Sequence, residues 1–572
     1  MSVILASLIN NKEILEKNIK NIFKYKNKNY PKSLKFYDDK FAINFLFNDN
    51  GSKSFFVEKN KFLICFNGSI LGSKKKNFLT AQDLLNLYKK KKDFLKYLNG
   101  FYSIVIYDIK KKKLLLIRDH AGVKNLFYKT INNGILITNY INVFYKSKLQ
   151  KFLPDTNNYL EHIIHGNIVG GDTIHHHIKE LPAAHFLEYK KKIFKLKEFW
   201  NYKNKFKKKN LHQNILRFDR ILKNVVNDWV PKKKNVSILL SGGVDSSLIS
   251  KLIYKKNTNI NFYTAIFDKK YNYNEVNLIT KENQKIKDKH KFIKIGEKAF
   301  GRDLIQFIKH TSHPITNFNG IVTNLICKHI QRKKKSNIVF CGEGSDELFS
   351  GFYRYYEIAT KYQLSKKIKD LIMSNNSLNV DRFKFLKKDF KYKIPSKRKE
   401  VANEIYEKIP IKKYLILDQK TYAPPYFDRL DQSSFINGID IRPIFMDKRI
   451  MEFSQQLRKD EYSILLDNKI LTKVFLRKYS EKYLPKDISY PSFKGQLMIP
   501  TSNWFFKGIL KNLFLKYFKK NTYFSKNFNI KKLFILFNQQ RPERQKKYDH
   551  STFFERILSY EIWLKLMNRN KK

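Results

Sequence analysis

Short apolar stretches separated by Gly, Asn and Asp make up the first two hundred residues of the chain. These stretches are rich in β-branched and aromatic residues, which favour strands over helices. One helical pattern, TAQDLLNLYKK, interrupts them, and Thr80 stands where an N-cap residue belongs. We therefore expect a strand-rich α+β domain over residues 1–200, with strands at 3–9, 41–47, 54–70, 101–108 and 113–119.

The pattern changes at about residue 214, where helical periodicity begins to alternate with short apolar runs. Alternation of this kind is typical of a parallel sheet covered by helices. After about residue 355 the pattern is mostly helical. The sequence thus predicts an α/β domain over 214–572, and the lysine-rich, glycine-free segment 201–213 is interpreted as a linker. The expected elements are strands at 236–240, 261–267 and 337–341, and helices at 246–256 and 346–358.

Composition narrows the class of protein. Apolar residues make up 42% of the 572 residues and aromatic residues 15%, which excludes a disordered chain. The three cysteines, Cys65, Cys327 and Cys341, show no C-x-x-C spacing, so we expect neither a disulfide framework nor a cysteine zinc site. The absence of a signal-peptide pattern and of any apolar run of ~18 residues predicts a cytoplasmic protein without membrane contact.

A net charge of +64 is the one compositional feature that suggests a polyanionic partner. A nucleic-acid surface gathers its Lys and Arg residues in a patch or stripe. Here the lysine clusters are scattered along the whole chain, and no RNA-binding aromatic pattern accompanies them. We therefore interpret the charge as solvated surface and expect no nucleic-acid partner.

The strongest chemical signal is the run SGGVDSS, which follows the strand expected at 236–240. Two glycines let the backbone turn tightly and approach an anion, and the N-terminus of the next helix offers free N–H groups. The run lacks the G-K-[ST] ending of a Walker A loop, and Asp245 beside phosphate suggests a bridging Mg²⁺. We expect the phosphates of a nucleotide to bind at Leu240, Ser241, Gly242, Gly243, Asp245, Ser246 and Ser247.

A second loop, CGEGSDE, also follows an expected strand and opens a helix. Loops at the carboxyl ends of strands gather at one edge of an open α/β sheet, so Asp346 can approach Asp245. Two carboxylates together with phosphate oxygens form a suitable Mg²⁺ site. The sequence therefore predicts a site in which Asp245 and Asp346 bind Mg²⁺ and Gly342 lies beside the phosphates.

These two loops together resemble the synthetase domain of asparagine synthetases, which belong to the pyrophosphatase-loop (PP-loop) ATPases. The segment 431–447, DQSSFINGIDIRPIFMD, is similar to the family pattern D-R-x-S-M-x-x-G-x-E-x-R-x-P-F-L-D. Lys473 and Arg477 fall in a K-x-x-L-R-like segment, and Lys494 matches the lysine of R-x-K-x-G-F-x-x-P. The later run SYEIWLKLM resembles the closing E-x-W helix of the family.

The first two hundred residues resemble the class II glutamine amidotransferase domain, an αββα sandwich of the N-terminal-nucleophile hydrolase type. FNGSILG is similar to F-N-G-E-I-Y-N, and RDHAGVKNLFYK is similar to R-D-x-x-G-x-K-P-L-Y-Y. Three features depart from the family. Position 2 is Ser instead of the nucleophilic Cys, Ser69 replaces a Glu, and no Arg-Gly-Pro-Asp counterpart lies between 30 and 50. A hydroxyl is a poorer nucleophile than a thiolate, so we expect a silent glutaminase whose remnant is Ser2, Asn67, Gly68 and Ser69.

For the synthetase half, the resemblance implies ATP and Mg²⁺ as cofactors and an acyl-adenylate intermediate, with pyrophosphate and AMP released. It assigns Lys494 to stabilising charge on the phosphate and Glu343 to orienting the amine. Asp440 occupies the position of a Glu in the family pattern. Gln496-Leu497 replaces a Gly-Phe pair that lies near the reacting carboxylate in the family. The default reaction joins aspartate and ammonia.

Several alternatives stay open at this stage. The chain could use its adenylate on another carboxylate, as in β-lactam-type ring closure or the amidation of a sugar uronate. Two further hypotheses are a tRNA-modifying PP-loop ATPase and a non-catalytic remnant that binds a partner. A separate glutaminase as a partner and a homodimer also stay open.

Overall fold

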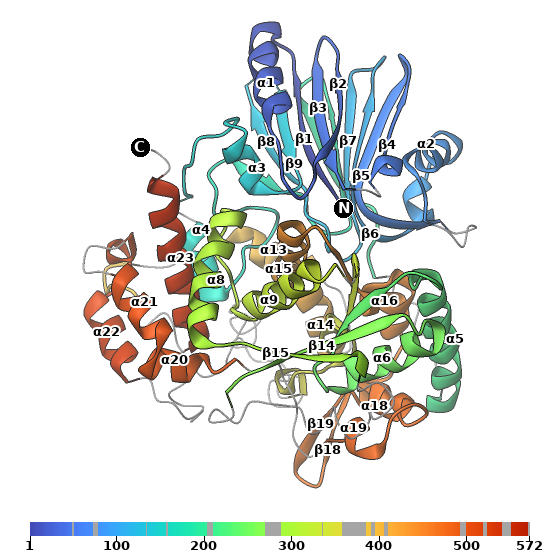
Figure 1. The fold of residues 1–572 in the computed structure, drawn as a ribbon, viewed down its shortest axis with the longest axis vertical. Coiled ribbons are helices and arrows are strands. Elements are labelled where there is room, and N and C mark those ends of the chain that lie inside the picture. Colours follow the sequence, from blue (N-terminus) through green and yellow to red (C-terminus); the bar gives the residue numbers. More distant parts are fainter. Residues whose placement is uncertain are drawn as a thin grey trace.

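The computed structural model divides into an antiparallel sandwich and a region built on a parallel sheet (Figure 1). The sandwich contains the N-terminus, and the closing helix of the described chain packs along the side of the parallel-sheet region. No helix in the described ranges is long and apolar enough to cross a bilayer. The structure describes residues 1–48, 51–72, 78–132, 134–155, 158–202, 210–268, 288–334, 336–356, 385–390, 395–404, 410–491, 499–518, 523–539 and 551–569.

Two six-stranded antiparallel sheets form the sandwich, in the orders β10-β8-β9-β1-β3-β2 and β12-β11-β7-β6-β5-β4. The strands predicted in this part of the sequence are all present, although the expected strand at 54–70 is two strands in the structure. The bounds are β1 (Ser2–Ile9), β2 (Lys32–Tyr37), β3 (Phe41–Phe47), β4 (Phe55–Glu58), β5 (Phe62–Gly72), β6 (Leu98–Asp108), β7 (Lys113–Arg118), β8 (Phe127–Ile131), β9 (Gly134–Thr138), β10 (Ile178–Glu180), β11 (His185–Lys190) and β12 (Ile193–Glu198).

Helices cover the outer faces of the two sheets, and a shared apolar cluster fills the space between them. Helix α1 (Lys12–Lys24) packs on β1 and β3, and α2 (Ala81–Lys90) packs on β4 and β5. The predicted N-cap of α2 is confirmed, since the Thr80 hydroxyl accepts the Asp83 N–H at 3.2 Å and the Asp83 carboxylate accepts the Thr80 N–H at 3.1 Å. The expected αββα arrangement is therefore present.

The second region is built on a five-stranded parallel sheet with the order β15-β14-β13-β16-β17. Strand β13 lies between β14 and β16, so the loops that follow β13 and β16 are neighbours. This arrangement confirms the predicted α/β fold. The bounds are β13 (Val236–Leu239), β14 (Ile260–Ile266), β15 (His290–Lys294), β16 (Ile338–Cys341) and β17 (Asp440–Pro443).

The described part of the chain after residue 355 is mostly helical, as predicted, but it also contains β17 and the hairpin β18 (Ser463–Leu466)–β19 (Lys469–Thr472). The helices outside α1 and α2 are α3 (Ile141–Lys146), α4 (Asn158–His165), α5 (Leu211–Trp229), α6 (Val244–Lys256), α8 (Glu297–Thr311), α9 (Asn319–Arg332), α10 (Ser345–Phe349), α13 (Ser396–Glu404), α14 (Pro410–Thr421), α15 (Ala423–Asn437), α16 (Lys448–Ser454), α17 (Lys459–Tyr462), α18 (Val474–Ser480), α19 (Lys486–Ser489), α20 (Thr501–Lys507), α21 (Ile509–Tyr517), α22 (Ile530–Asn538) and α23 (Ser551–Arg569).

Two element boundaries differ from the expectations. The helix expected at 346–358 is interrupted after Phe349, because Ser350 adopts the left-handed conformation (φ 60°) and the Gly351 N–H returns to the Asp346 carbonyl at 2.8 Å. Residues 353–356 are helical again. Helix α5 begins at Leu211, within the segment interpreted as a linker. It begins there because the side chain of Asn210 accepts the Gln213 N–H at 2.8 Å and caps the helix.

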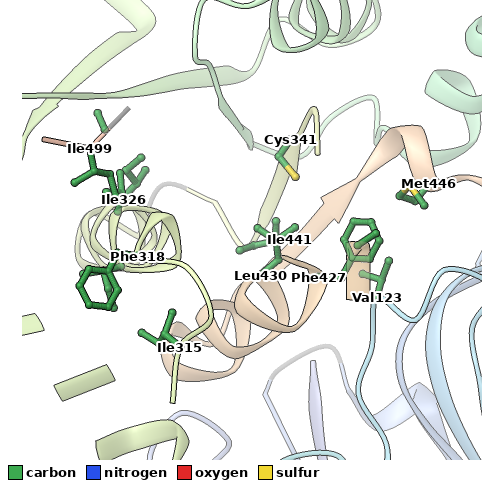
Figure 2. Packing of buried hydrophobic residues seen from close by; sticks show 14 of the residues in the cluster. Val123, Ile315, Phe318, Ile326, Cys341, Phe427, Leu430, Ile441, Met446 and Ile499 are labelled. Atoms are coloured by element: carbon green, nitrogen blue, oxygen red, sulfur yellow. The ribbon is translucent and has the colours of Figure 1, made fainter. Parts of the chain in front are cut away.

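A single large apolar cluster joins the parallel sheet to its helices and reaches into the sandwich. Figure 2 shows Phe427 and Leu430 of α15 beside Ile441 of β17, with Val123 of the sandwich close to Phe427. Cys341 is buried in the same cluster at the end of β16. The two regions therefore share buried surface and do not pack as independent bodies.

A tightly bonded loop of the sandwich, residues 119–125, forms part of this contact. The Asp119 carboxylate accepts the N–H groups of Val123 and Lys124 at 3.0 and 2.9 Å. Buried Arg118 donates to the carbonyl oxygens of Gly122 and Lys124 at 2.8 and 3.0 Å. These bonds account for the R-D-x-x-G-x-K pattern physically, because they fix the backbone that presents Lys124 to the other region.

Lys124 enters a buried ionic network across the interface. Its ammonium lies 3.1 Å from Asp431 and 3.3 Å from Asp440, and Arg442 lies 2.8 Å from Asp440. Burial alone would raise the pKa of Asp440, but Arg442 and Lys124 hold it below its ordinary value. The same two carboxylates raise the pKa of Lys124 against the opposing effect of burial. Asp440 and Lys124 are therefore both charged at neutral pH, and each depends on its partners.

Replacing Lys124 with Met removes a cation and leaves Asp431 and Asp440 short of a buried partner. We expect the free energy of unfolding to fall by about 3 kcal/mol, because an uncompensated buried charge is costly. Lys110, which is exposed in the turn between β6 and β7, provides the control, and Lys110→Met should change stability by less than about 0.5 kcal/mol. Urea unfolding followed by circular dichroism measures both, and equal midpoints for the two variants would contradict the role of Lys124.

Candidate active site

The loop after β13 turns into α6 through three residues of the SGGVDSS run. Gly242 adopts a left-handed conformation (φ 85°), and Gly243 is the N-cap of α6. The Ser246 hydroxyl accepts the Ser241 N–H at 3.1 Å and lies 3.2 Å from the Gly243 carbonyl oxygen. The loop is therefore closed on itself by Ser246, and the first turn of α6 carries Asp245.

The residues that flank this turn are buried. Leu240 belongs to the core cluster, and its carbonyl oxygen accepts the Thr264 hydroxyl of β14. Ser247 is also buried, and its N–H donates to the Gly243 carbonyl oxygen at 3.1 Å. These contacts anchor the loop to the sheet on one side and to the helix on the other.

Two glycines leave space for close contacts at this place: Gly342 in the loop after β16, and Gly351 just after α10. A Cβ atom on Gly342 would lie 3.2 Å from the Asp245 Cβ, so a side chain there would press on the first loop. A Cβ atom on Gly351 would lie 1.6 Å from Asp346 Oδ1 and 2.4 Å from Lys473 Cε. The chain can bring Asp245, Asp346 and Lys473 together because both positions lack a side chain.

A buried ammonium joins the two carboxylates predicted from the sequence. Lys473 Nζ lies 2.5 Å from Asp245 Oδ2 and 2.8 Å from Asp346 Oδ1. Burial would lower the pKa of Lys473, but the two carboxylates raise it above its ordinary value. The expected convergence of Asp245 and Asp346 is thus present in the structure, and a lysine stands between them.

The backbone holds Lys473 in an uncommon conformation for a residue with a side chain. Lys473 has φ 56° and lies between hairpin β18–β19 and α18. Buried Arg477 donates to the carbonyl oxygen of Thr472 at 2.7 Å and to that of Ser489 at 2.6 Å. Arg477 thereby fixes the strand end from which Lys473 reaches the carboxylates.

This cluster keeps an excess of negative charge and one unused acceptor. Asp245 Oδ1 is buried, and no described residue hydrogen-bonds with it. The two carboxylates outnumber the Lys473 ammonium by one charge. Glu347 adds no further charge, because burial and the neighbouring acids Asp346 and Glu343 raise its pKa to about 8.

Glu343 lies on the same loop and is held by an arginine that the sequence analysis did not select. Arg429 of α15 contacts Glu343 Oε1 at 2.8 Å, and its guanidinium lies 4.3 Å from the centre of the Tyr426 ring. Glu343 itself is partly exposed, whereas Arg429 is buried. The carboxylate is therefore oriented by a fixed cation.

The residues expected to be a glutaminase remnant lie together at the interface, on β1 and β5. The buried Ser2 hydroxyl donates to the Phe66 carbonyl oxygen at 3.1 Å, which is its one hydrogen-bond partner among the described residues. The Ser2 N–H donates to Asn67 Oδ1 at 3.0 Å. Among the described residues, no acidic or basic side chain is a hydrogen-bond partner of this hydroxyl.

The next two residues of β5 contact backbone or the other region. Gly68 has φ 110° and lies against the backbone of Phe101. The Ser69 hydroxyl donates to Asp440 Oδ2 at 3.3 Å and accepts a bond from Arg442 at 3.0 Å. Ser69 therefore belongs to the ionic network of the interface, and so does Asp440.

Some expected residues lie outside the part of the chain that the structure describes. Lys494 and the Gln496-Leu497 pair fall in the segment 492–498, which is not described. Conversely, the sequence analysis did not predict that Lys473 contacts Asp245 and Asp346, or that Arg429 contacts Glu343. Each contacts residues that lie 86 or more positions away in the sequence, and no local pattern indicates such a contact.

Comparison with known proteins agrees with this geometry. A family model described as asparagine synthase matches residues 217–565, and one described as a glutamine amidotransferase domain matches residues 46–200. The asparagine synthetase [glutamine-hydrolyzing] of Bos taurus is 24% identical over 328 residues, which cover 53% of this chain and 56% of the bovine protein. Asparagine synthetase [glutamine-hydrolyzing] 3 of Bacillus subtilis is 23% identical over 70% of this chain and 67% of its own.

The chain thus spans a little over half the length of the bovine relative. Among solved structures, the glutamine phosphoribosylpyrophosphate amidotransferase from B. subtilis matches with a TM-score of 0.23 and 11% identity, over 46% of this chain and 65% of that chain. The asparagine synthase match covers more than half of this chain and includes both loops that carry Asp245 and Asp346. The chain therefore belongs to the asparagine synthase family.

Proposed function

We propose that this chain is an ATP-dependent carboxylate–amine ligase that releases AMP and pyrophosphate. In this proposal residues 214–572 carry the synthetase, and residues 1–200 are a glutaminase-like domain without its reaction. The observation that carries the proposal is the meeting of Asp245, Asp346 and Lys473 at the ends of β13 and β16. Ligands of open α/β sheets bind at such strand ends.

The phosphates of ATP fit the loop from Leu240 to Ser247. The loop ends at the first turn of α6, a thirteen-residue helix whose N-terminus favours negative charge. Lys473 supplies a buried positive charge at the same place. Gly342 supports this assignment, because its lack of a side chain leaves the second loop close to the first.

The residues present also fit Mg²⁺. Asp245 Oδ1 is a buried acceptor that no described residue uses, and the cluster carries an excess negative charge. Oxygen ligands of this type are the ones that Mg²⁺ prefers beside phosphates. Asp245 and Asp346 would hold the ion, which supplies charge neutralisation on the pyrophosphate.

The chemistry then follows in two steps. An acceptor carboxylate oxygen attacks the α-phosphorus of ATP, so that a P–O bond forms and the bond to pyrophosphate breaks. The nitrogen of ammonia next attacks the acyl carbon, the C–O bond to AMP breaks, and a proton leaves the nitrogen. Glu343, oriented by Arg429, would accept that proton, and Lys494 would stabilise the charge on the phosphate.

The nitrogen donor in this proposal is free ammonia or ammonia from a separate glutaminase. The Ser2 hydroxyl is bonded to a backbone carbonyl, and Ser69 is engaged by Asp440 and Arg442 of the other region. These contacts support a domain that stabilises the synthetase instead of hydrolysing glutamine. Aspartate is the default acceptor.

Replacing either Asp245 or Asp346 with Asn should lower pyrophosphate release from MgATP by roughly 100-fold or more, because each change removes a charge from the proposed metal site. Asp460→Asn provides the control, since Asp460 is an exposed carboxylate on α17. The assay contains aspartate and ammonium and measures pyrophosphate with a coupled enzyme. Full activity in Asp245→Asn or Asp346→Asn would contradict the assignment of that carboxylate.

Ammonium, but not glutamine, should support formation of asparagine from aspartate and MgATP. Ser2→Ala should leave the ammonium-dependent rate within about twofold of the parent, because Ser2 takes no part in the proposed reaction. The products are measured by mass spectrometry, with glutamate as the marker of glutamine hydrolysis. Glutamine-dependent asparagine formation that Ser2→Ala abolishes would overturn the assignment of a silent glutaminase.

A further inference from the structure

Three hairpin turns lie side by side at one end of the second sheet of the sandwich. They join β4 to β5 (59–61), β6 to β7 (109–112) and β11 to β12 (191–192). The six strands follow one another in the order β12-β11-β7-β6-β5-β4, and the Ile109 N–H donates to the Lys61 carbonyl oxygen at 3.0 Å. Strand β7 leads from this end to the loop that contacts the parallel-sheet region, so the turns lie at the end away from that contact (Figure 1).

These turns bring together lysine clusters that are far apart in the sequence. Seven of the nine turn residues are lysines and none is acidic; the lysines are Lys59, Lys61, Lys110, Lys111, Lys112, Lys191 and Lys192. Lys61 lies 3.7 Å from Glu58. Lys112 contacts Asp38 and Asp39. The other five are exposed and have no ion-pair partner among the described residues. The expectation that the charge is only solvated surface rested on the scatter of these clusters along the sequence, and the strand order removes that scatter.

Three of the turn lysines have a backbone conformation that is unfavourable for lysine. Lys191 and Lys192 have φ 49° and 68°, the positive values of a type I′ turn, and Lys112 has φ 47°. Asn and Gly adopt this region at lower cost, and Asn60 (φ 55°) does so in the β4–β5 turn. Lysine therefore stands at positions where another residue would favour the fold more, which indicates a use for its charge.

The positive charge forms a row along one sheet. Neighbouring strands lie about 4.8 Å apart, so the three turns follow one another at intervals of about 10 Å over about 20 Å. The other sheet contributes the β2–β3 turn at this end, where Asp38 lies 3.1 Å from Lys112. Residues 38–40 of that turn are two aspartates and one lysine. The row is therefore bordered by acidic residues on the side of the other sheet.

We propose that this row of lysines binds the phosphate backbone of a nucleic acid without reading its bases. A duplex carries one negative charge per about 1.7 Å of its axis, so its backbone can place several phosphates along the row. The turns contain no arginine, the residue that most often reads guanine. The surface lies at the far end of the sandwich from the parallel sheet, so this binding is separate from the ligase reaction proposed above.

An anionic membrane is the competing partner, because Ile193 is exposed beside the β11–β12 turn and could enter a lipid surface. A membrane plane laid on this end of the sandwich would also meet Asp38 and Asp39 in the turn of the other sheet. A linear backbone can follow the lysines alone. The shape of the charged surface thus favours a nucleic acid.

The test is fluorescence anisotropy of a labelled DNA duplex of about 20 base pairs and arbitrary sequence, titrated with the full chain. The wild type should bind it at about 50 mM salt and lose roughly 100-fold in affinity at about 200 mM salt. Lys191→Asn combined with Lys192→Gly should weaken binding at the lower salt by roughly 10-fold or more, because contacts to phosphates are lost. The midpoint of thermal unfolding should not fall in this variant, since Asn and Gly favour the turn, so that misfolding cannot cause the loss.

Lys232→Asn combined with Lys233→Gly is the matched control, since these exposed lysines belong to a cluster outside the three turns. It removes the same charge and should leave the affinity within about twofold of the wild type. Equal losses in the two double variants, or a wild type that does not bind the duplex at about 50 mM salt, would overturn the inference. Binding to vesicles that contain phosphatidylserine, without binding to the duplex, would overturn it in favour of a membrane surface.

Discussion

The ammonium of Lys473 between Asp245 and Asp346 is the interaction on which the geometry of the candidate active site depends. Strands β13 and β16 are parallel neighbours, so the loops that follow them meet at one edge of the sheet. The carboxylates of Asp245 and Asp346 therefore lie close together. Without a cation, their repulsion in a partly buried place would be unfavourable. The hairpin β18–β19, the left-handed backbone at Lys473 and the open space at Gly351 all serve to deliver that cation.

A second set of buried charges performs a structural task. Lys124 and Arg442 neutralise Asp431 and Asp440 across the contact between the sandwich and the parallel-sheet region, and Ser69 joins them. Ser69 and Lys124 of the glutaminase-like domain are thus bonded to the neighbouring region, and each buried charge of this contact has a partner.

Much of the fold could be predicted from sequence, because strand periodicity and the glycine loops are local signals. The strand-rich first domain, the parallel sheet and the convergence of Asp245 with Asp346 followed from such signals, and the αββα arrangement followed from the resemblance to class II glutamine amidotransferases. The early end of α10 did not, since it depends on Ser350 entering the left-handed region. The contacts of Lys473, Lys124 and Arg429 could not be predicted either, because their partners lie up to 316 residues away along the chain, as Asp440 does from Lys124. The role of Lys494 stays a prediction, since that residue lies outside the described part of the chain.

The central claim is that an acceptor carboxylate takes AMP from ATP before the amine attacks. This claim is tested most directly by turnover of aspartate labelled with ¹⁸O in its side-chain carboxylate, with MgATP and ammonium present and AMP analysed by mass spectrometry. The acceptor oxygen that attacks the α-phosphorus stays with the phosphate when the amide forms, so the account predicts AMP that carries one ¹⁸O atom. Unlabelled AMP, formed together with asparagine, would contradict it.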